Sequence, residues 1–170
     1  MGLHLQIIIA LIYIIITQMM LNYYLINKYG KILSYDMGPK IGEIFLVDKF
    51  GMSELLNSSD TSQFKNAKAL LCFISLKCPA CKDILTYLND RYNDNHKYIS
   101  VIAMGNRSDV EKWYKENNYK FNTYYAEQEV ILNDLQIRKF PYSFELEYSK
   151  VKKKGPIYKE MLDYHILLNS

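Results

Sequence analysis

The segment from Leu5 to Ile26 constrains this chain more than any other, because it holds no charged side chain over about 22 residues. At a rise of about 1.5 Å per residue, an α-helix of that length crosses the hydrocarbon core of a bilayer. The alternative is a buried core helix, but the isoleucine and leucine residues would occur on every face, and a small domain rarely surrounds a helix completely. A cleavable signal peptide would begin with a basic region and end in small residues, which is not the pattern here. The segment is therefore predicted to be a transmembrane helix.

The rest of the chain has the length and composition of one domain. The chain has 170 residues, of which 49% are hydrophobic, enough for a single core. We predict that residues 1–34 form a membrane anchor with a short juxtamembrane segment, and that residues 35–170 form the domain. The net charge of +3 is small and its basic residues are spread along the sequence, which argues against a nucleic-acid partner. The lysines from Lys150 to Lys154 precede Gly155-Pro156 and are predicted to lie in a solvated turn.

Apolar patterning predicts strands that alternate with helices. Residues 69–74 and 98–104 are continuous apolar runs of the kind found in strands buried on both faces. Between them, apolar residues recur every three or four positions after Cys78, which predicts an amphipathic helix. Residues 35–66, with their glycines and polar stretch, are interpreted as a linker and the approach to the domain.

The second half of the domain is predicted in the same way. Ser108 and Glu111 have the spacing of a capping box, which predicts a helix that starts near Ser108. Residues 142–148 alternate between aromatic or aliphatic and polar side chains, as in a strand with one wet face. A last helix is expected from about Pro156, with Tyr158 among its buried side chains. Together these elements predict an α/β sandwich with a late hairpin and a closing helix.

The segment Cys78-Pro79-Ala80-Cys81 lies where the first buried strand gives way to the amphipathic helix. Free backbone N–H groups and the helix dipole favour an anion at a helix N-terminus, and Lys77 adds a positive charge, so Cys78 is expected to ionise more readily than an ordinary thiol. Pro79 suits the first helical position because no hydrogen bond is lost there. Cys81 follows one turn later on the same face. This arrangement predicts Cys78 as a nucleophile and Cys81 as the thiol that resolves a mixed disulfide.

Four other interpretations of the two cysteines were weighed. Structural zinc needs four ligands, but the three histidines show no pairing at ligand spacing and Cys72 lies in a predicted buried strand. A purely structural disulfide would close a very small loop and remove little entropy from the unfolded chain. A metal-handling protein that carries Cu(I) on the two thiolates remains an alternative, although no histidine or methionine stands within the motif. The last alternative is a non-catalytic membrane module that only holds a partner.

Two segments resemble the thioredoxin superfamily, in particular its membrane-anchored TlpA-like and MauD-type members. Residues 73–82 resemble the active-site stretch, and residues 137–142 precede the alternating strand where the superfamily carries its cis-proline. The resemblance implies a thioredoxin-like three-layer sandwich with a mixed central sheet. It also implies that Pro141 is cis and packs against Cys78, and that the backbone of Phe140 pairs with an extended substrate segment. Lys77, Pro79, Ala80, Phe140 and Pro141 are therefore expected to support the two cysteines.

The same resemblance carries expectations about activity and location. It implies a thiol-disulfide oxidoreductase that acts on thiols and disulfides of exported proteins, exchanges electrons with a membrane or soluble partner, and needs no metal or organic cofactor. Lys28, Lys31 and Lys40 follow the predicted span, and the positive-inside rule would leave the domain in the cytoplasm. We follow the resemblance instead, since such domains act outside the cytoplasmic membrane, where disulfides persist. Membrane lipid is then contacted through the N-terminal helix alone.

Three positions depart from the family pattern. Cys72 stands where thioredoxin has a buried acid that assists the resolving thiol, and Lys77 stands where TlpA-like proteins commonly have tryptophan. Phe140 is bulkier than the residue usual before the cis-proline. Cys72 is expected to be an inert core thiol, with a regulatory role as the alternative. These departures leave open the direction of electron flow and the identity of the substrate.

Overall fold

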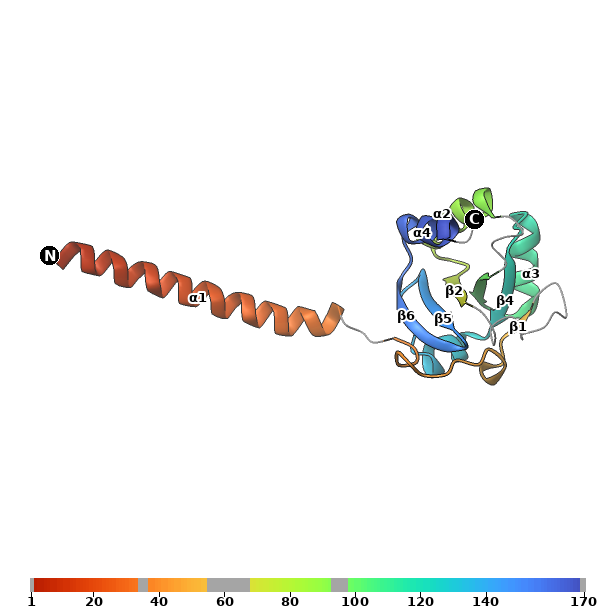
Figure 1. The fold of residues 1–170 in the computed structure, drawn as a ribbon, viewed down its shortest axis with the longest axis horizontal. Helices are drawn as coiled ribbons and strands as arrows, with labels where there is room; N and C mark the ends of the chain where they lie inside the picture. The colour runs from red at the N-terminus through yellow and green to blue at the C-terminus, as the bar shows by residue number, and fades with distance from the viewer. Residues whose placement is uncertain (1, 34–36, 55–67, 93–97, 169–170) are drawn as a thin grey trace. The chain divides into compact units, whose positions relative to one another are not determined.

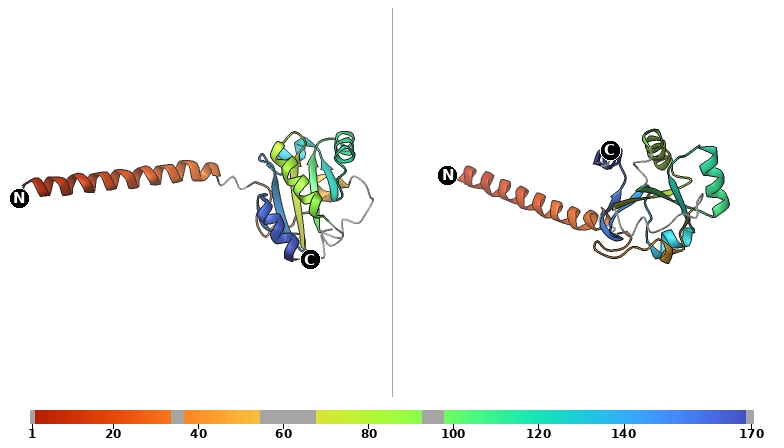
Figure 2. Two further views of the ribbon diagram at one scale, coloured as in Figure 1. Left: turned by 90° about the horizontal axis from the view of Figure 1, so that it is seen from above. Right: turned by 45° about the vertical axis from the view of Figure 1, so that its right-hand side comes forward.

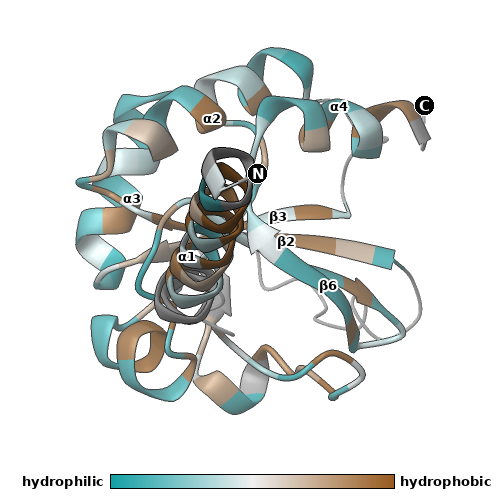
Figure 3. Cartoon of the chain, turned by 90° about the vertical axis from the view of Figure 1, so that its left-hand side faces the viewer, coloured by the Kyte–Doolittle hydropathy of each residue, from teal (hydrophilic) through white to brown (hydrophobic). Residues whose placement is uncertain are grey.

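The computed structural model describes residues 2–33, 37–54, 68–92 and 98–168, which belong to two compact units, residues 1–36 and 37–170. The predicted boundary between residues 34 and 35 lies outside the described residues. The first unit is the helix α1 (Gly2–Leu33; Figure 1). Its segment Gln6–Leu25 is long and apolar enough to cross a membrane. Hydrophobic residues recur along this helix in Figure 3. This unit is a candidate transmembrane segment, as the sequence predicts.

The second unit is built on a six-stranded mixed sheet with the strand order β1-β4-β3-β2-β5-β6. The strands are β1 (Ser53–Glu54), β2 (Lys68–Ser75), β3 (Ile99–Met104), β4 (Asn122–Ala126), β5 (Tyr142–Glu147) and β6 (Lys150–Pro156). Strands β2, β3 and β4 are parallel to one another, whereas β1, β5 and β6 pair antiparallel with their neighbours. The thioredoxin-like sandwich with a mixed sheet is thereby confirmed.

The central strand β2 divides the domain into two cores, because its side chains alternate between the faces of the sheet. Leu70, Cys72 and Ile74 join the helix-side core, which is covered by α2 (Pro79–Arg91), α3 (Arg107–Glu116) and α4 (Lys159–Leu168) (Figure 2). Leu71 and Phe73 join the loop-side core on the other face. That face is covered by residues 37–52, which include the 3-10 turn η1 (Asp48–Phe50), and by the π-helical segment η4 (Val130–Asp134). The domain therefore has three layers.

Residues 37–52 are part of the loop-side core, so their interpretation as a linker is wrong. Phe45 is fully buried, with its ring 5.2 Å from that of Phe50 and 5.4 Å from that of Phe144. The segment is fixed to the sheet because the Gly42 N–H donates to the Val151 carbonyl at 2.7 Å. Four consecutive apolar residues without a strand or helix period hid this packing from the sequence. The polar stretch 57–63 lies outside the described residues.

The lysine-rich segment forms the edge strand β6 rather than a turn. Its pairing with β5 places Lys152 3.0 Å from the carboxylate of Glu147 across the strands. The turn lies earlier, at Tyr148 and Ser149, which have φ angles of 51° and 60°. Tyr148 is therefore exposed and is not the last residue of the alternating strand. Lysines at a sheet edge are a common protection against pairing with other chains, which explains why their charge does not prevent a strand here.

Two helix starts differ from the prediction. Asn106 caps α3, since its side-chain oxygen accepts the Asp109 N–H at 2.9 Å. Ser108 instead lies inside the first turn and donates its hydroxyl to Asn106 at 2.7 Å. Helix α4 begins at Lys159, so Tyr158 precedes it and is exposed, while Leu162 supplies the fully buried side chain. Asparagine is as good an N-cap as serine, and the capping-box spacing alone could not separate them.

Candidate active site

Cys78 lies at the junction between the central strand and α2. Strand β2 ends at Ser75, and the extended backbone of Cys78 makes it the N-cap of α2. Its sulfur accepts the backbone N–H of Cys81 at 3.2 Å, and Pro79 occupies the first helical turn, where its missing N–H costs no bond. An N–H group that points at the sulfur, together with the positive end of the helix dipole, stabilises negative charge on Cys78.

Cys81 faces the helix-side core and is only 1% exposed. Burial is the main cause that raises the pKa of the Cys81 thiol from 9.0 to about 12, and its hydrogen bond with Cys78 adds to the increase. A backbone hydrogen bond with Ser75 opposes this change. Cys81 is therefore a neutral thiol near neutral pH. The two thiols occupy contrasting surroundings, one at a helix end and one in the core.

The second predicted segment comes to the same place. The Phe140-Pro141 peptide bond is cis, as the resemblance implied. The Cys78 thiol donates to the Phe140 carbonyl at 3.7 Å, although the two residues are 62 positions apart. They meet because β5 pairs with β2, with Phe73 opposite Tyr142. The backbone next to Pro141 therefore borders the sulfur of Cys78.

The remaining predicted residues lie around the pair. Lys77 and Ala80 are exposed beside the cysteines. Cys72 is 1% exposed within the helix-side core, and burial raises the pKa of its thiol to about 12. That position suits an inert core thiol. In the parts of the chain that the structure describes, no three His, Cys, Asp or Glu side chains come together as a metal site.

A cavity of about 170 Å³ opens beside the two cysteines, and sequence reasoning missed it. Its walls come from the end of β2 and from α2 and α3, and its lining consists of Ser75, Leu76, Cys78, Cys81, Lys82, Leu85, Trp113 and Asn117. Trp113 is the only tryptophan of the chain and lies on α3. Its ring centroid lies 4.9 Å from that of Tyr119. Only the packing of α3 beside α2 shows that Trp113 borders the dithiol.

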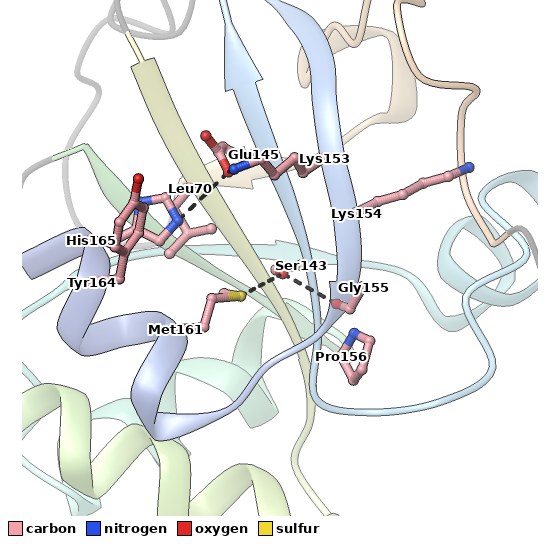
Figure 4. A pocket seen from close by; sticks show the side chains of 10 residues that line it. All are labelled: Leu70, Ser143, Glu145, Lys153, Lys154, Gly155, Pro156, Met161, Tyr164 and His165. Carbon is pink, nitrogen blue, oxygen red and sulfur yellow. Dashed lines mark hydrogen bonds and ion pairs between the residues drawn. The ribbon is translucent and has the colours of Figure 1, made fainter.

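A second cavity, of about 230 Å³, lies between α4 and strands β5 and β6 and has no cysteine in its lining (Figure 4). His165 lines it with its ring 3.8 Å from the Glu145 carboxylate. Burial lowers the pKa of His165, and Glu145 opposes this change. Ser143 donates to the Gly155 carbonyl at 3.2 Å in the same cavity. Because no cysteine lines it, this cavity is not assigned to thiol chemistry.

The fold of the second unit is thioredoxin-like, and the two cysteines lie at the N-terminal end of α2. No protein-family model matches the sequence, and no curated protein is significantly similar to it. Similar solved structures include StoA from Bacillus subtilis, which is 21% identical with a TM-score of 0.56, over 74% of this chain and 98% of that one. The thioredoxin domain of a thiol-disulfide oxidoreductase from Bacteroides vulgatus is 18% identical with a TM-score of 0.58, over 78% and 99% of the two chains. An exposed lipoprotein thioredoxin from Streptococcus pneumoniae is 18% identical with a TM-score of 0.55, over 69% and 98%. At these identities the comparisons show the fold.

Proposed function

We propose that the protein is a thiol-disulfide oxidoreductase in which Cys78 is the nucleophile and Cys81 the resolving thiol. The observation that carries the proposal is the position of the Cys78 sulfur, which accepts the Cys81 N–H at 3.2 Å and lies 3.7 Å from the Phe140 carbonyl. Charge on the sulfur is stabilised from one side, and a backbone that can pair with a substrate borders it on the other. The similarity of the fold to that of a thiol-disulfide oxidoreductase from Bacteroides vulgatus supports this assignment.

The reaction follows from two thiol-disulfide exchanges. The Cys78 thiolate attacks one sulfur of a substrate disulfide, a mixed disulfide forms, and the other substrate sulfur leaves as a thiolate that takes up a proton. Cys81 then loses its proton and attacks the Cys78 sulfur, which releases the second substrate thiol. The substrate gains two electrons and the protein dithiol becomes a disulfide. Run in reverse, the same steps oxidise a substrate dithiol.

The neighbouring residues have supporting roles in this proposal. Pro79 and Ala80 begin α2 and so hold the two cysteines one turn apart, while Lys77 adds positive charge next to the nucleophile. Phe140 and Pro141 present the backbone against which a substrate cysteine would be aligned as an added strand. No metal or organic group takes part in these steps.

The proposal extends to location, with α1 as a membrane anchor and the domain outside the cytoplasmic membrane. The apolar segment Gln6–Leu25 supports the anchor, and the similarity to an exposed lipoprotein thioredoxin from Streptococcus pneumoniae supports the location. Exported proteins are then the substrates. A reporter that is active only outside the cytoplasm, fused after Ser170, is expected to be active. Activity of a reporter that works only inside the cytoplasm would contradict the location.

The experiment that tests the function is a titration of the full chain in detergent micelles against glutathione redox buffers. The Cys78-Cys81 pair is expected to titrate as one two-electron couple, and Cys78→Ser is the control that removes it. A potential near about −270 mV would make the protein a reductant, whereas one near about −120 mV would make it an oxidant. The absence of any titratable disulfide would refute the enzyme assignment.

A further inference from the structure

Exposed cationic side chains bracket the dithiol. Two belong to the cysteine segment and two to the cis-proline segment: Lys77, Lys82, Arg138 and Lys139. Residues 75–83 and 136–142 contain these four basic residues and a single acidic residue, Asp83. No ion pair joins any of the four to another residue in the described part of the chain. Because the Phe140 carbonyl lies 3.7 Å from the Cys78 sulfur, the two segments present their charge at one place.

The cavity beside the cysteines has a mixed lining, in which Ser75, Lys82 and Asn117 lie opposite an apolar wall. Leu76 and Leu85 contribute aliphatic carbon to its lining, and the half-buried indole of Trp113 contributes an aromatic surface. Cys78 lines the same cavity, so a residue next to a cysteine that is bonded to Cys78 is within reach of it. Consecutive Cα atoms are about 3.8 Å apart, so the side chain next to the bonded cysteine lies close to the mouth of the cavity. A volume of about 170 Å³ accommodates one apolar side chain rather than a folded element.

We propose that this site selects an acidic polypeptide that carries an apolar side chain next to its reactive cysteine. The inference rests on the proposed function and specifies its substrate class. Basic side chains without ion-pair partners increase the rate at which a negatively charged partner associates, and this effect weakens as salt is added. The apolar wall of the cavity acts after arrival, since it removes part of one apolar side chain from water while the mixed disulfide forms.

The charge is tested with short disulfide-bonded peptides flanked either by glutamate or by lysine. The reduced full chain in neutral detergent micelles is mixed with each peptide, and the single-turnover rate is followed by the fluorescence of Trp113. At about 0.02 M ionic strength, the glutamate peptide is expected to react about tenfold faster than the lysine peptide. At about 1 M salt, where the Debye length is about 3 Å, the two rates are expected to converge.

Variants assign this preference to the site. Lys82→Glu and Lys139→Glu, made as separate single variants, are each expected to reduce the preference for the glutamate peptide. Lys120→Glu is the matched control, because Lys120 precedes the N-terminal end of β4, at the opposite edge of the parallel strands from Cys78. This control is expected to retain the wild-type preference. An equal loss in the control would show that net charge, and not the bracketing set, is responsible.

The apolar part is tested with peptides that carry phenylalanine or alanine next to the cysteine. The phenylalanine peptide is expected to be favoured about tenfold in kcat/KM, and Trp113→Ala is expected to remove most of that advantage. Since Trp113 packs against Tyr119, Trp113→Phe serves as a second variant that preserves the packing and should give an intermediate preference. Both are followed by thiol quantification after an acid quench.

A small neutral disulfide, hydroxyethyl disulfide, separates the inference from the proposed function. If it is reduced normally while the peptides show no preference for glutamate or phenylalanine, the substrate class is refuted and the oxidoreductase remains. If neither the peptides nor this disulfide react, the proposed function itself fails, and the substrate class fails with it.

Discussion

The burial of Cys81 predicts that the second half of the reaction is slow and strongly dependent on pH. A rise in pKa from 9.0 to about 12 lowers the thiolate fraction at pH 7 from about 10⁻² to about 10⁻⁵. A more basic thiolate is a better nucleophile. With a Brønsted coefficient of about 0.45, this higher nucleophilicity offsets about 20-fold of the decrease in thiolate fraction. Attack by Cys81 on the mixed disulfide should therefore be about 50-fold slower at pH 7 than attack by an exposed thiol in the same geometry.

The assay is the reaction of the reduced full chain with excess dithiobis-nitrobenzoate in a stopped-flow instrument. A first release of the coloured thiolate reports attack by Cys78, and a second, independent of reagent concentration, reports resolution by Cys81. Because the Cys81 pKa is raised, the thiolate fraction increases as the pH rises toward 12, so the second rate should increase about tenfold per unit between pH 7 and pH 10. Cys81→Ser should lose the second phase, and Cys72→Ala should retain both. A second rate that levels off at or below pH 9 would refute the reasoning.

Three further predictions concern stability, measured as the free energy of unfolding in urea. Burial raises the Cys72 pKa from 9.0 to about 12. The stability that Cys72 contributes is therefore complete below pH 9 and is lost as the pH rises toward 12. Between pH 8 and pH 10, the free energy of unfolding should decrease by about 1.4 kcal/mol more in the wild type than in Cys72→Ala. Equal losses would contradict this. Phe45→Ala should cost about 3 to 5 kcal/mol, since its ring packs on those of Phe50 and Phe144, whereas a cost below about 1 kcal/mol would restore the linker interpretation. Gly38→Ala should cost about 2 kcal/mol or more, because Gly38 has a φ of +78° and an added Cβ would overlap the ring of Phe144; Gly42→Ala, also at positive φ but in open space, is its control and should cost less.

The parts of the fold that sequence predicted are those with strong local patterns. Strands β2 and β3 are continuous apolar runs, and α2 has an apolar stripe after a clear N-terminus. Strand β4 was missed because its sequence, Asn-Thr-Tyr-Tyr-Ala, has no period, and its burial comes from β3 and β1 on either side. Strand β6 was missed because four of its seven residues are lysines and only Val151 is fully buried. Such elements are stabilised by pairing with distant strands, which local patterns do not record.

The candidate site, like the fold, was predicted from the sequence only in part. The spacing of Cys78 and Cys81 indicated a nucleophile and a resolving thiol, and the cis state of Pro141 followed from resemblance to a family. The cavity did not follow from either, because it exists only where α3 brings Trp113 beside α2. A tryptophan on a helix face is more often part of a core, and its sequence position gives no sign that it borders a reactive thiol.

The register between β2 and β5 explains why the two halves of the site meet. Phe73 lies opposite Tyr142, so Pro141 stands at the end of β2 from which the chain continues to Cys78. The side chains of Tyr142, Phe144 and Leu146 all enter the loop-side core. A shift of one residue would turn all three to the other face of the sheet and place Ser143, Glu145 and Glu147 in the loop-side core instead. The alternation that predicted this strand therefore also fixes its register, and the position of the Phe140 carbonyl beside the Cys78 sulfur depends on the burial of three side chains that do not belong to the site.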